Sequence, residues 1–354
     1  MKMQTGVFGS YHLQHKCVMR EFYSLAVPAK TLIKYPYASV YVLKQNFIYN
    51  PLFIEISERR PMLIDTTLVK KLVDKQFPQW SSEGISPVEK SGWDNRTFHL
   101  GKNMLVRLPS SDDYVSQVEK EQRWLPELAK VASLPIPRPV AKGISSTDFP
   151  RPWSVYEWIE GETILNKCPK DLDSIAYDLA EFLNSLDKAD TEGAPLAGKH
   201  NFYRGCSLNN YEKDIYKSLE VLKNEIDTET VIAVWDKASE HEWSQPSVWF
   251  HGDMSLGNIL VKDGKLSAII DFGCSAVGDP ACDLAIAWTL FEGNSRRIFE
   301  EKRNVDAYTW NRGRGWALWK ALIIWSGIDS NQSDRNKVEQ IVREIVIDHQ
   351  LQLG

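Results

Sequence analysis

The 354-residue sequence lacks any apolar run close to the ~20 residues that a membrane-spanning helix needs, so no membrane partner is expected. The N-terminus lacks the basic start and unbroken apolar segment of a secretory signal. No cysteine lies in a CxxC pair or beside spaced histidines, which argues against a zinc site, and five is an odd number, which argues against a disulfide framework. These absences predict a globular protein of a reducing cytoplasm.

Acidic residues are in excess only in the C-terminal part of the chain. Residues 1–61 carry 8 Lys and Arg against 3 Asp and Glu, residues 62–155 carry 13 against 11, and residues 156–354 carry 21 against 33. An acidic surface repels nucleic acid and attracts cationic small molecules. We therefore expect no nucleic-acid partner, and the charge favours a cationic ligand.

The first 61 residues show neither a helical nor a strand period, and regular patterning begins at Met62. Glu58-Arg59-Arg60 can be encoded by an all-purine stretch that resembles a bacterial ribosome-binding site. Our hypothesis is that Met62 is the biological start and that residues 1–61 are an upstream reading-frame artefact. A genuine flexible extension is the alternative.

Beyond Met62 a strand-rich part precedes a helical part. Turn residues predict a loop at Ser91–Arg96 between strands of an antiparallel meander, and the Pro-rich stretch near residue 135 closes the helix that follows. The expected strands are 97–100, 104–108 and 153–158, and the expected helices are 68–77 behind a cap at 65–67, 114–125, 171–188 and 208–224.

The segment 250–273 carries the residues that indicate chemistry. Asp253 and Asn258 stand five residues apart on one expected loop, and Asp271 follows the next expected strand. Phosphoryl transfer needs a base beside the acceptor hydroxyl, metal ions that neutralise charge, and fixed geometry. The spacing therefore predicts Asp253 as the catalytic base and Asn258 and Asp271 as oxygen ligands of Mg²⁺.

His251-Gly252-Asp253, with Asn258 and then Asp271-Phe272-Gly273, resembles the aminoglycoside phosphotransferase family, a relative of protein kinases. The run 278–284 (Gly-Asp-Pro-Ala-Cys-Asp-Leu) strengthens the resemblance, which covers about residues 70–354. It implies a bilobal α+β kinase-like fold, with a nucleotide-binding N-lobe at 62–155 and a C-lobe at 156–354. It also implies a kinase that moves the γ-phosphate of ATP or GTP to a small-molecule hydroxyl.

The resemblance places a phosphate-binding cation at Arg107, where the family usually has Lys. Its partner on the following helix is expected at Glu121, with Glu119 as the competing choice. The loop covering the phosphates corresponds to residues 91–97, in which Gly92 and Asn95 are candidate nucleotide contacts. The hinge between the lobes corresponds to residues 156–159, where the backbones of Glu157 and Ile159 would face the purine.

The same family pattern suggests supporting roles around the loop. We expect His251 to organise the loop, and Asp279 and Asp283 to cap the next helix and brace the catalytic loop, with Pro280 as the first helical residue.

The resemblance favours an aminoglycoside-like or other antibiotic as the acceptor. A more apolar macrolide and a metabolite such as choline, homoserine or a sugar are the alternatives. A non-catalytic, nucleotide-binding or partner-binding pseudokinase is a further alternative. Five tryptophans in the C-terminal helices would either pack the core or line a pocket for an apolar acceptor: Trp288, Trp310, Trp316, Trp319 and Trp325.

Overall fold

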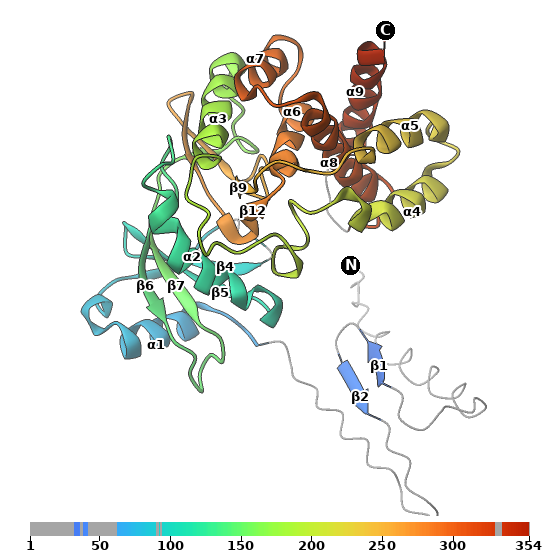
Figure 1. Cartoon of the computed structure of the whole chain (residues 1–354). Helices are drawn as coiled ribbons and strands as arrows, with labels where there is room; N and C mark the ends of the chain where they lie inside the picture. Colours follow the sequence, from blue (N-terminus) through green and yellow to red (C-terminus); the bar gives the residue numbers. More distant parts are fainter. Residues whose placement is uncertain are drawn as a thin grey trace, which may run out of the picture. The chain divides into compact units, whose positions relative to one another are not determined.

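The structure is a computed structural model of the chain, and it divides into two compact units, Met1–Leu63 and Ile64–Gly354 (Figure 1). The described residues are 32–35, 38–41, 62–89, 92, 94–329 and 335–353. In the first unit, strands β1 (Leu32–Tyr35) and β2 (Ala38–Tyr41) form an antiparallel hairpin, which the sequence pattern did not predict. The choice between a start at Met62 and a genuine extension otherwise falls outside the described residues.

The second unit is bilobal and α+β, as predicted, because its buried apolar side chains form two separate clusters. The N-terminal lobe contains a five-stranded antiparallel sheet with strand order β3-β4-β5-β7-β6. Its strands are β3 (Ile85–Pro87), β4 (Asn95–Leu100), β5 (Met104–Pro109), β6 (Pro139–Gly143) and β7 (Trp153–Glu157).

Two helices accompany this sheet. Helix α1 (Thr66–Gln76) begins at Asp65, whose carboxylate caps it by accepting a hydrogen bond from the backbone N–H of Leu68. Val69, Leu72 and Val73 of α1 are buried against the sheet, so the predicted capped helix is confirmed. Helix α2 (Val115–Leu128) follows β5 and contacts both the sheet and the C-terminal lobe, which places its side chains between the lobes.

The predicted turn at Ser91–Arg96 is too long at its C-terminal end. Strand β4 already begins at Asn95, and both Asn95 and Arg96 pair with β5 opposite Pro109 and Leu108. Asn95 is only 6% exposed in this position. The helix predicted at 114–125 is likewise displaced: it ends at Leu128 and is preceded by a 3₁₀ turn, η3 (Asp112–Tyr114).

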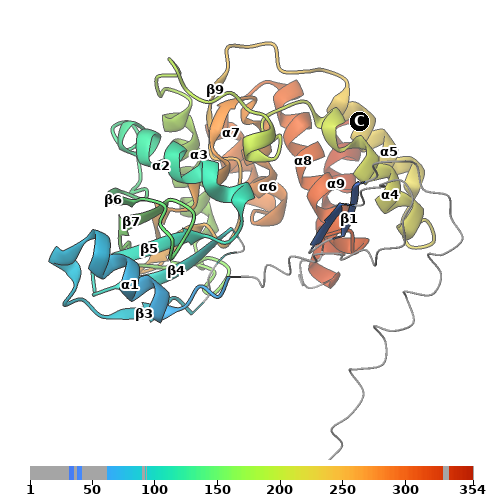
Figure 2. The same cartoon turned by 90° about the horizontal axis from the view of Figure 1, so that it is seen from below.

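The C-terminal lobe is mainly helical, with helices above the five-stranded sheet in Figure 1 and spread beside it in Figure 2. Its helices are α3 (Leu172–Leu186), α4 (Glu212–Leu222), α5 (Thr228–Ser239), α6 (Ile286–Thr289), α7 (Gly293–Arg303), α8 (Ala307–Trp325) and α9 (Arg335–Leu353). Among the described residues, the 3₁₀ turns besides η3 are η2 (Pro78–Trp80), η4 (Lys199–Asn201), η5 (Leu208–Tyr211), η6 (Phe272–Cys274) and η7 (Pro280–Ala285).

Two small sheets between these helices carry the segment 250–273. Strand β9 (Val248–Phe250) pairs with β12 (Ala276–Gly278), and β10 (Ile259–Lys262) pairs with β11 (Lys265–Ile269) and with β8 (Glu162–Thr163). The chain therefore leaves β9, makes the loop 251–258, called the catalytic loop below after the base predicted on it, and returns through a hairpin to a point beside its start.

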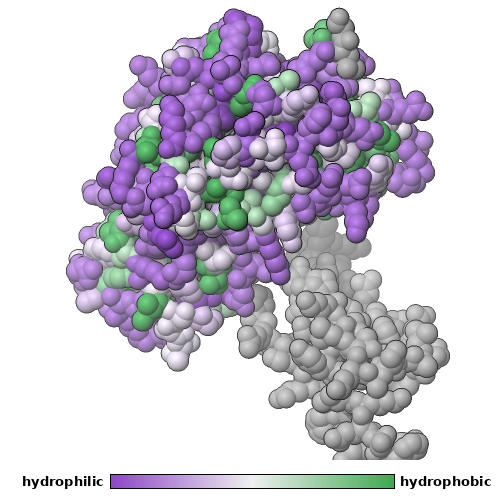
Figure 3. Space-filling view, in the orientation of Figure 1, coloured by the Kyte–Doolittle hydropathy of each residue, from purple (hydrophilic) through white to green (hydrophobic). Residues whose placement is uncertain are grey.

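The five tryptophans of the C-terminal helices are each at most 7% exposed and belong to the main apolar cluster, which confirms core packing for them. On the face shown in Figure 3, hydrophilic residues predominate and apolar residues form small separate groups. Within the described part of the chain, none of the helices is both long and apolar enough to cross a membrane.

Candidate active site

The loop after β9 is fixed by one buried carboxylate. Asp283, on η7, accepts hydrogen bonds from the backbone N–H groups of His251 (2.6 Å) and Gly252 (2.8 Å) and is 2% exposed. Gly252 has a φ of +83°, and a Cβ there would lie 2.4 Å from the carbonyl oxygen of Cys274, so only glycine fits. The predicted bracing role of Asp283 is confirmed.

Asp279 caps η7, as predicted. Its carboxylate accepts from the backbone N–H of Ala281 (3.1 Å), with Pro280 as the first residue of the turn. It also forms a buried ion pair with Arg312 of α8, at 2.6 Å. Burial raises the pKa of the Asp279 carboxyl, and the Arg312 guanidinium counteracts this. The turn that carries Asp283 is therefore anchored to the helical part of the lobe.

His251 is fully buried and organises the loop, as expected. Its Nδ1 accepts the backbone N–H of Asp253 (3.2 Å), so its proton lies on Nε2, which donates to the carbonyl oxygen of Ile270 (3.0 Å). Both ring nitrogens are thus used in joining the catalytic loop to the end of β11. A histidine with both nitrogens committed to backbone groups positions the loop and has no free nitrogen for proton transfer.

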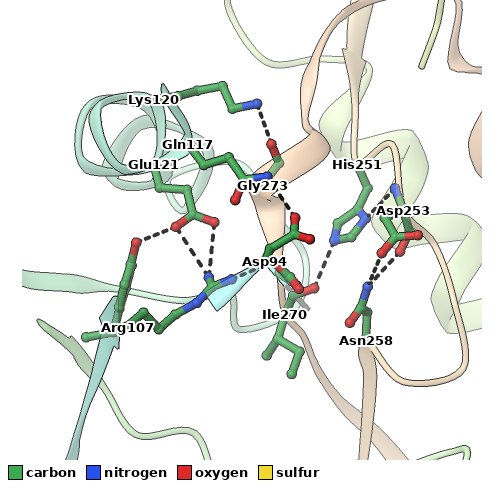
Figure 4. Close-up of polar contacts among 12 residues, drawn as sticks. Asp94, Arg107, Gln117, Lys120, Glu121, His251, Asp253, Asn258, Ile270 and Gly273 are labelled. Carbon is green, nitrogen blue, oxygen red and sulfur yellow. Dashed lines mark hydrogen bonds and ion pairs between the residues drawn. The ribbon is translucent and has the colours of Figure 1, made fainter. Parts of the chain in front are cut away.

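The exposed carboxylate of Asp253 is joined to Asn258. The Asn258 Nδ2 donates both to the backbone carbonyl and to Oδ2 of Asp253, each at 2.9 Å (Figure 4). Because the amide nitrogen is committed in this way, the amide oxygen of Asn258 is left for another partner. The Asn258 carbonyl also accepts the backbone N–H of Ile270 (2.9 Å), which fixes the loop beside Asp271.

Asp271 stands at the junction of the lobes in a strained backbone conformation. Its φ of +66° and ψ of +69° lie in the left-handed region, which is uncommon outside glycine and clusters at functional sites. Its Oδ1 lies 2.7 Å from Nη2 of Arg107. Burial would raise the pKa of the Asp271 carboxyl, but the Arg107 charge and hydrogen bond outweigh burial and hold this pKa below its ordinary value.

Arg107, on β5, lies between two carboxylates, of which Figure 4 labels that of Glu121. Besides Asp271, its Nη1 contacts Oε1 and Oε2 of Glu121 at 3.2 and 3.3 Å, and the hydroxyl of Tyr156 donates to the same Glu121. Burial alone would lower the pKa of Arg107, but the two carboxylates raise it well above its ordinary value. Glu119, the competing partner, points elsewhere and pairs with Lys142 at the exposed surface.

Three further residues of the site, Gln117, Lys120 and Asp94, were not singled out from the sequence. Gln117 of α2 donates to Asp94 (2.9 Å), and Lys120 donates to the carbonyl oxygens of Gly273 (2.7 Å) and Ser275 (2.8 Å). Burial lowers the pKa of Lys120 to about 8. The signal was available in part, because Gln117 and Lys120 lie on the face of α2 that carries Glu121.

Asp94 lies directly before β4 and faces the site. Burial raises the pKa of its carboxyl; the hydrogen bond from Gln117 lowers it, and the charges of Asp271 and Asp253 raise it. This carboxylate therefore lies within electrostatic reach of both aspartates of the predicted catalytic segment.

The predicted nucleotide contacts Gly92, Glu157 and Ile159 are not part of the ion-pair network of Arg107. The carbonyl oxygen of Gly92 accepts from Arg96 (3.0 Å), while its neighbours Ser91 and Trp93 lie outside the described residues. The Glu157 backbone N–H, at the end of β7, is already used by the carbonyl oxygen of Arg138 (3.0 Å), and Ile159 lies half-buried in the connection between the lobes.

The side chains of Asn258 and Asp271 are suited to binding Mg²⁺. The amide oxygen of Asn258 and the ionised carboxylate of Asp271 are hard oxygen donors, and the Ile270–Asn258 backbone hydrogen bond holds their chain segments together. Within the described residues no group of three His, Cys, Asp or Glu side chains forms a closed metal cage. Two side-chain ligands with further positions for phosphate and water are the arrangement that Mg²⁺ commonly takes.

Comparison with known proteins agrees with this geometry. The sequence profile of the phosphotransferase enzyme family matches residues 85–320. Aminoglycoside 3'-phosphotransferase of Escherichia coli is 27% identical over 161 residues, which cover 44% of this chain and 59% of that protein's length. The match thus spans less than two thirds of this relative.

Solved structures share the fold at low identity. The GDP complex of wild-type aminoglycoside 2'-phosphotransferase-IIIa superposes with a TM-score of 0.61 and 19% identity, covering 81% of this chain and 100% of the other. Macrolide 2'-phosphotransferase type I gives a TM-score of 0.53 and 16% identity, covering 79% and 96%. Because the family profile matches more than half of its residues, this chain belongs to the phosphotransferase enzyme family.

Proposed function

We propose that this protein transfers the γ-phosphoryl group of ATP or GTP to a hydroxyl of a small molecule, with an aminoglycoside-like or other antibiotic as the first candidate acceptor. One observation carries the proposal. The accessible carboxylate of Asp253 is held by Asn258 on a loop that ends beside Asp271, and Asp271 is paired with the half-buried cation Arg107. In this proposal these residues supply a base, a metal-ligand pair and a phosphate-binding cation at one place.

In this function each residue has a distinct task. Asp253 accepts the proton of the acceptor hydroxyl, and its contact with Asn258 fixes the direction in which the carboxylate points. Asn258 and Asp271 would hold Mg²⁺, which supplies charge neutralisation at the transferring phosphoryl group. Arg107 binds nucleotide phosphate oxygens, and Glu121 orients its guanidinium.

The nucleotide is held at the remaining predicted positions. The loop at Gly92 and the adjoining first residue of β4, Asn95, cover the phosphates, and the backbones of Glu157 and Ile159 face the purine. This assigns residues 62–155 to a nucleotide-binding lobe and residues 156–354 to a lobe that carries the catalytic loop and the acceptor site. A reaction that consumes ATP or GTP is in keeping with a cytoplasmic location.

The acceptor class rests on the relatives and on charge. The curated relative is an aminoglycoside phosphotransferase, and the C-terminal segment is acidic, as suits a polycationic acceptor. A metabolic kinase acting on choline, homoserine or a sugar is the second candidate, because the same arrangement of base and metal ligands serves any hydroxyl. The intact, accessible Asp253 argues against a non-catalytic role.

A coupled nucleotide-consumption assay tests the proposal. ATP and GTP are compared in the presence of Mg²⁺ against aminoglycosides, macrolides, choline, homoserine and sugars, with Asp253→Ala as the control. We expect acceptor-stimulated turnover that the variant lacks. Nucleotide binding without turnover on any acceptor in the panel would count against catalysis and for the pseudokinase alternative.

A further inference from the structure

Arg204 lies in a cluster of aromatic rings in the C-terminal lobe. Its Cζ is 4.7 Å from the ring centroid of Trp319, 5.6 Å from that of Trp316 and 5.9 Å from that of Tyr211. The three rings also contact one another, with centroids 4.2 to 5.7 Å apart. Cation–π contact with three rings holds the guanidinium in one place without using its N–H groups as hydrogen-bond donors.

This guanidinium has no carboxylate partner in the described part of the chain. Among the described residues, its one hydrogen bond is from Nη1 to the hydroxyl of Tyr211, at 3.4 Å. Every other described arginine that is not exposed pairs with an Asp or a Glu: Arg107, Arg151, Arg296, Arg303, Arg312 and Arg314. The exception is notable because the lobe carrying Arg204 has acid in excess.

Arg204 is attached to the catalytic loop. The fully buried Asn201 donates from Nδ2 to the carbonyl oxygens of Arg204 (2.9 Å) and Cys274 (3.2 Å), and the same Cys274 carbonyl packs on Gly252, the neighbour of Asp253. Burial raises the pKa of the Cys274 thiol to about 12; the Asp253 carboxylate raises it too, and the Arg204 guanidinium opposes both. Both charges therefore act on one atom beside the site.

The backbone leading into Arg204 is strained. Phe202 and Tyr203 have φ values of 57° and 60°, so two successive residues with large side chains occupy the left-handed region. A non-glycine residue in this region is strained and persists only where its surroundings impose it. Here the Tyr211 hydroxyl donates to the carbonyl oxygen of Phe202, and the Asn201 amide holds the following turn. Strain of this kind is concentrated at ligand-binding sites.

We propose that Arg204 is an anion-binding residue on the acceptor side of the active site. Its free N–H groups suit the oxygens of a carboxylate or a phosphoryl group, which a planar guanidinium binds through two parallel hydrogen bonds. The oxyanion has two sources: an anionic substituent of the acceptor, or the phosphoryl group as it passes to the acceptor. The kinetic part of this inference rests on the proposed function, but anion binding itself does not.

The first experiment measures anion binding by the full chain without nucleotide. Inorganic phosphate is titrated into the wild type, Arg204→Met and Arg123→Met. Methionine keeps a long apolar side chain among the rings, and Arg123 is a matched control, an exposed arginine 4.7 Å from the Trp124 centroid. We expect phosphate affinity to fall at least about tenfold in Arg204→Met alone. Equal affinity in all three folded proteins, checked by circular dichroism, overturns the proposal.

The second experiment identifies the source of the anion. Initial rates are measured with homoserine and with homoserine amide, in which an uncharged amide group replaces the carboxylate. If the acceptor carries the anion, Arg204→Met raises the KM for homoserine about tenfold or more, with little change for the amide. If the phosphoryl group is the anion, kcat falls with both acceptors and KM is unchanged. Unchanged kinetics with both acceptors contradicts the proposal. Phosphate binding that depends on Arg204 in a chain inactive on every acceptor supports it and refutes the proposed function.

Discussion

The catalytic loop and the ion-pair network that joins the two lobes through Arg107 are held together in different ways. The loop is held by hydrogen bonds between side chains and nearby backbone groups, above all the two that Asp283 accepts from His251 and Gly252. The network joins Arg107 to Glu121 and to Asp271, which are 14 and 164 residues away, by charge. The loop is therefore a property of one lobe, whereas the network depends on how the two lobes meet.

The largest expected effect is on the chemistry of the loop. Asp253→Ala removes the proposed base, so we expect kcat to fall by about 10²–10⁴-fold. The nucleotide contacts on β5 and α2 are untouched, so the nucleotide Kd should stay within about twofold of wild type. Asp236→Ala, on the exposed side of α5, is the control. Steady-state kinetics and calorimetric titration report the two quantities, and a variant with wild-type kcat would refute the assignment.

Asp271 lies beside the catalytic loop and also belongs to the ion-pair network of Arg107. Asp271→Asn removes the charge but keeps a residue that tolerates the left-handed backbone. In the wild type we expect Mg²⁺ to increase nucleotide affinity at least about tenfold and EDTA to reverse this, whereas the variant should bind nucleotide equally with and without metal. Titrations with and without EDTA measure it. A variant that retains the metal effect would place Mg²⁺ on other residues.

Much of the loop could be predicted from sequence because its residues lie close together in the chain. The five-residue interval from Asp253 to Asn258, and the glycine at Gly252, are local features that follow from the geometry of one loop. The roles of Asp279 and Asp283 followed from the family pattern. The start of β4 at Asn95 was missed because pairing with β5 outweighed the turn preference of the local sequence.

The network and the cluster around Arg204 could be predicted less well. The sequence favoured Glu121 over Glu119 as the partner of Arg107 only by resemblance, and the fold decides which acid turns inward. The sequence likewise gave no indication that Arg204 would meet rings from α8. Contacts between residues more than a hundred positions apart depend on tertiary packing, which local patterns do not encode.

Removal of the buried acid that holds the catalytic loop should lower the stability of the protein. Asp283→Ala leaves two buried N–H groups without an acceptor, so we expect a loss of ~2–4 kcal/mol in the free energy of unfolding, together with a lower kcat. Urea denaturation, with Asp236→Ala as the control, measures it. A variant as stable as wild type would show that the loop does not depend on Asp283.

The smallest effects compare two glutamates on one helix. Glu121→Gln weakens the orientation of Arg107, so we expect the nucleotide Kd to rise about tenfold, or ~1.4 kcal/mol. Glu119→Gln removes only an exposed pair with Lys142 and should change the Kd by less than about twofold. Calorimetric titration of both variants checks the difference. Equal effects would mean that the ion pair of Arg107 with Glu121 has no part in nucleotide binding.

The central claim is that a phosphoryl group passes from nucleotide to an acceptor hydroxyl with the help of Asp253. Phosphorus NMR of the wild type and Asp253→Ala, each with Mg²⁺, ATP and the acceptor that stimulates turnover, tests it most directly. The account predicts a new phosphate-ester signal equal to the ADP formed in the wild type, and none in the variant over the same time. The same ester signal in both proteins, or ADP accompanied only by inorganic phosphate, would contradict it.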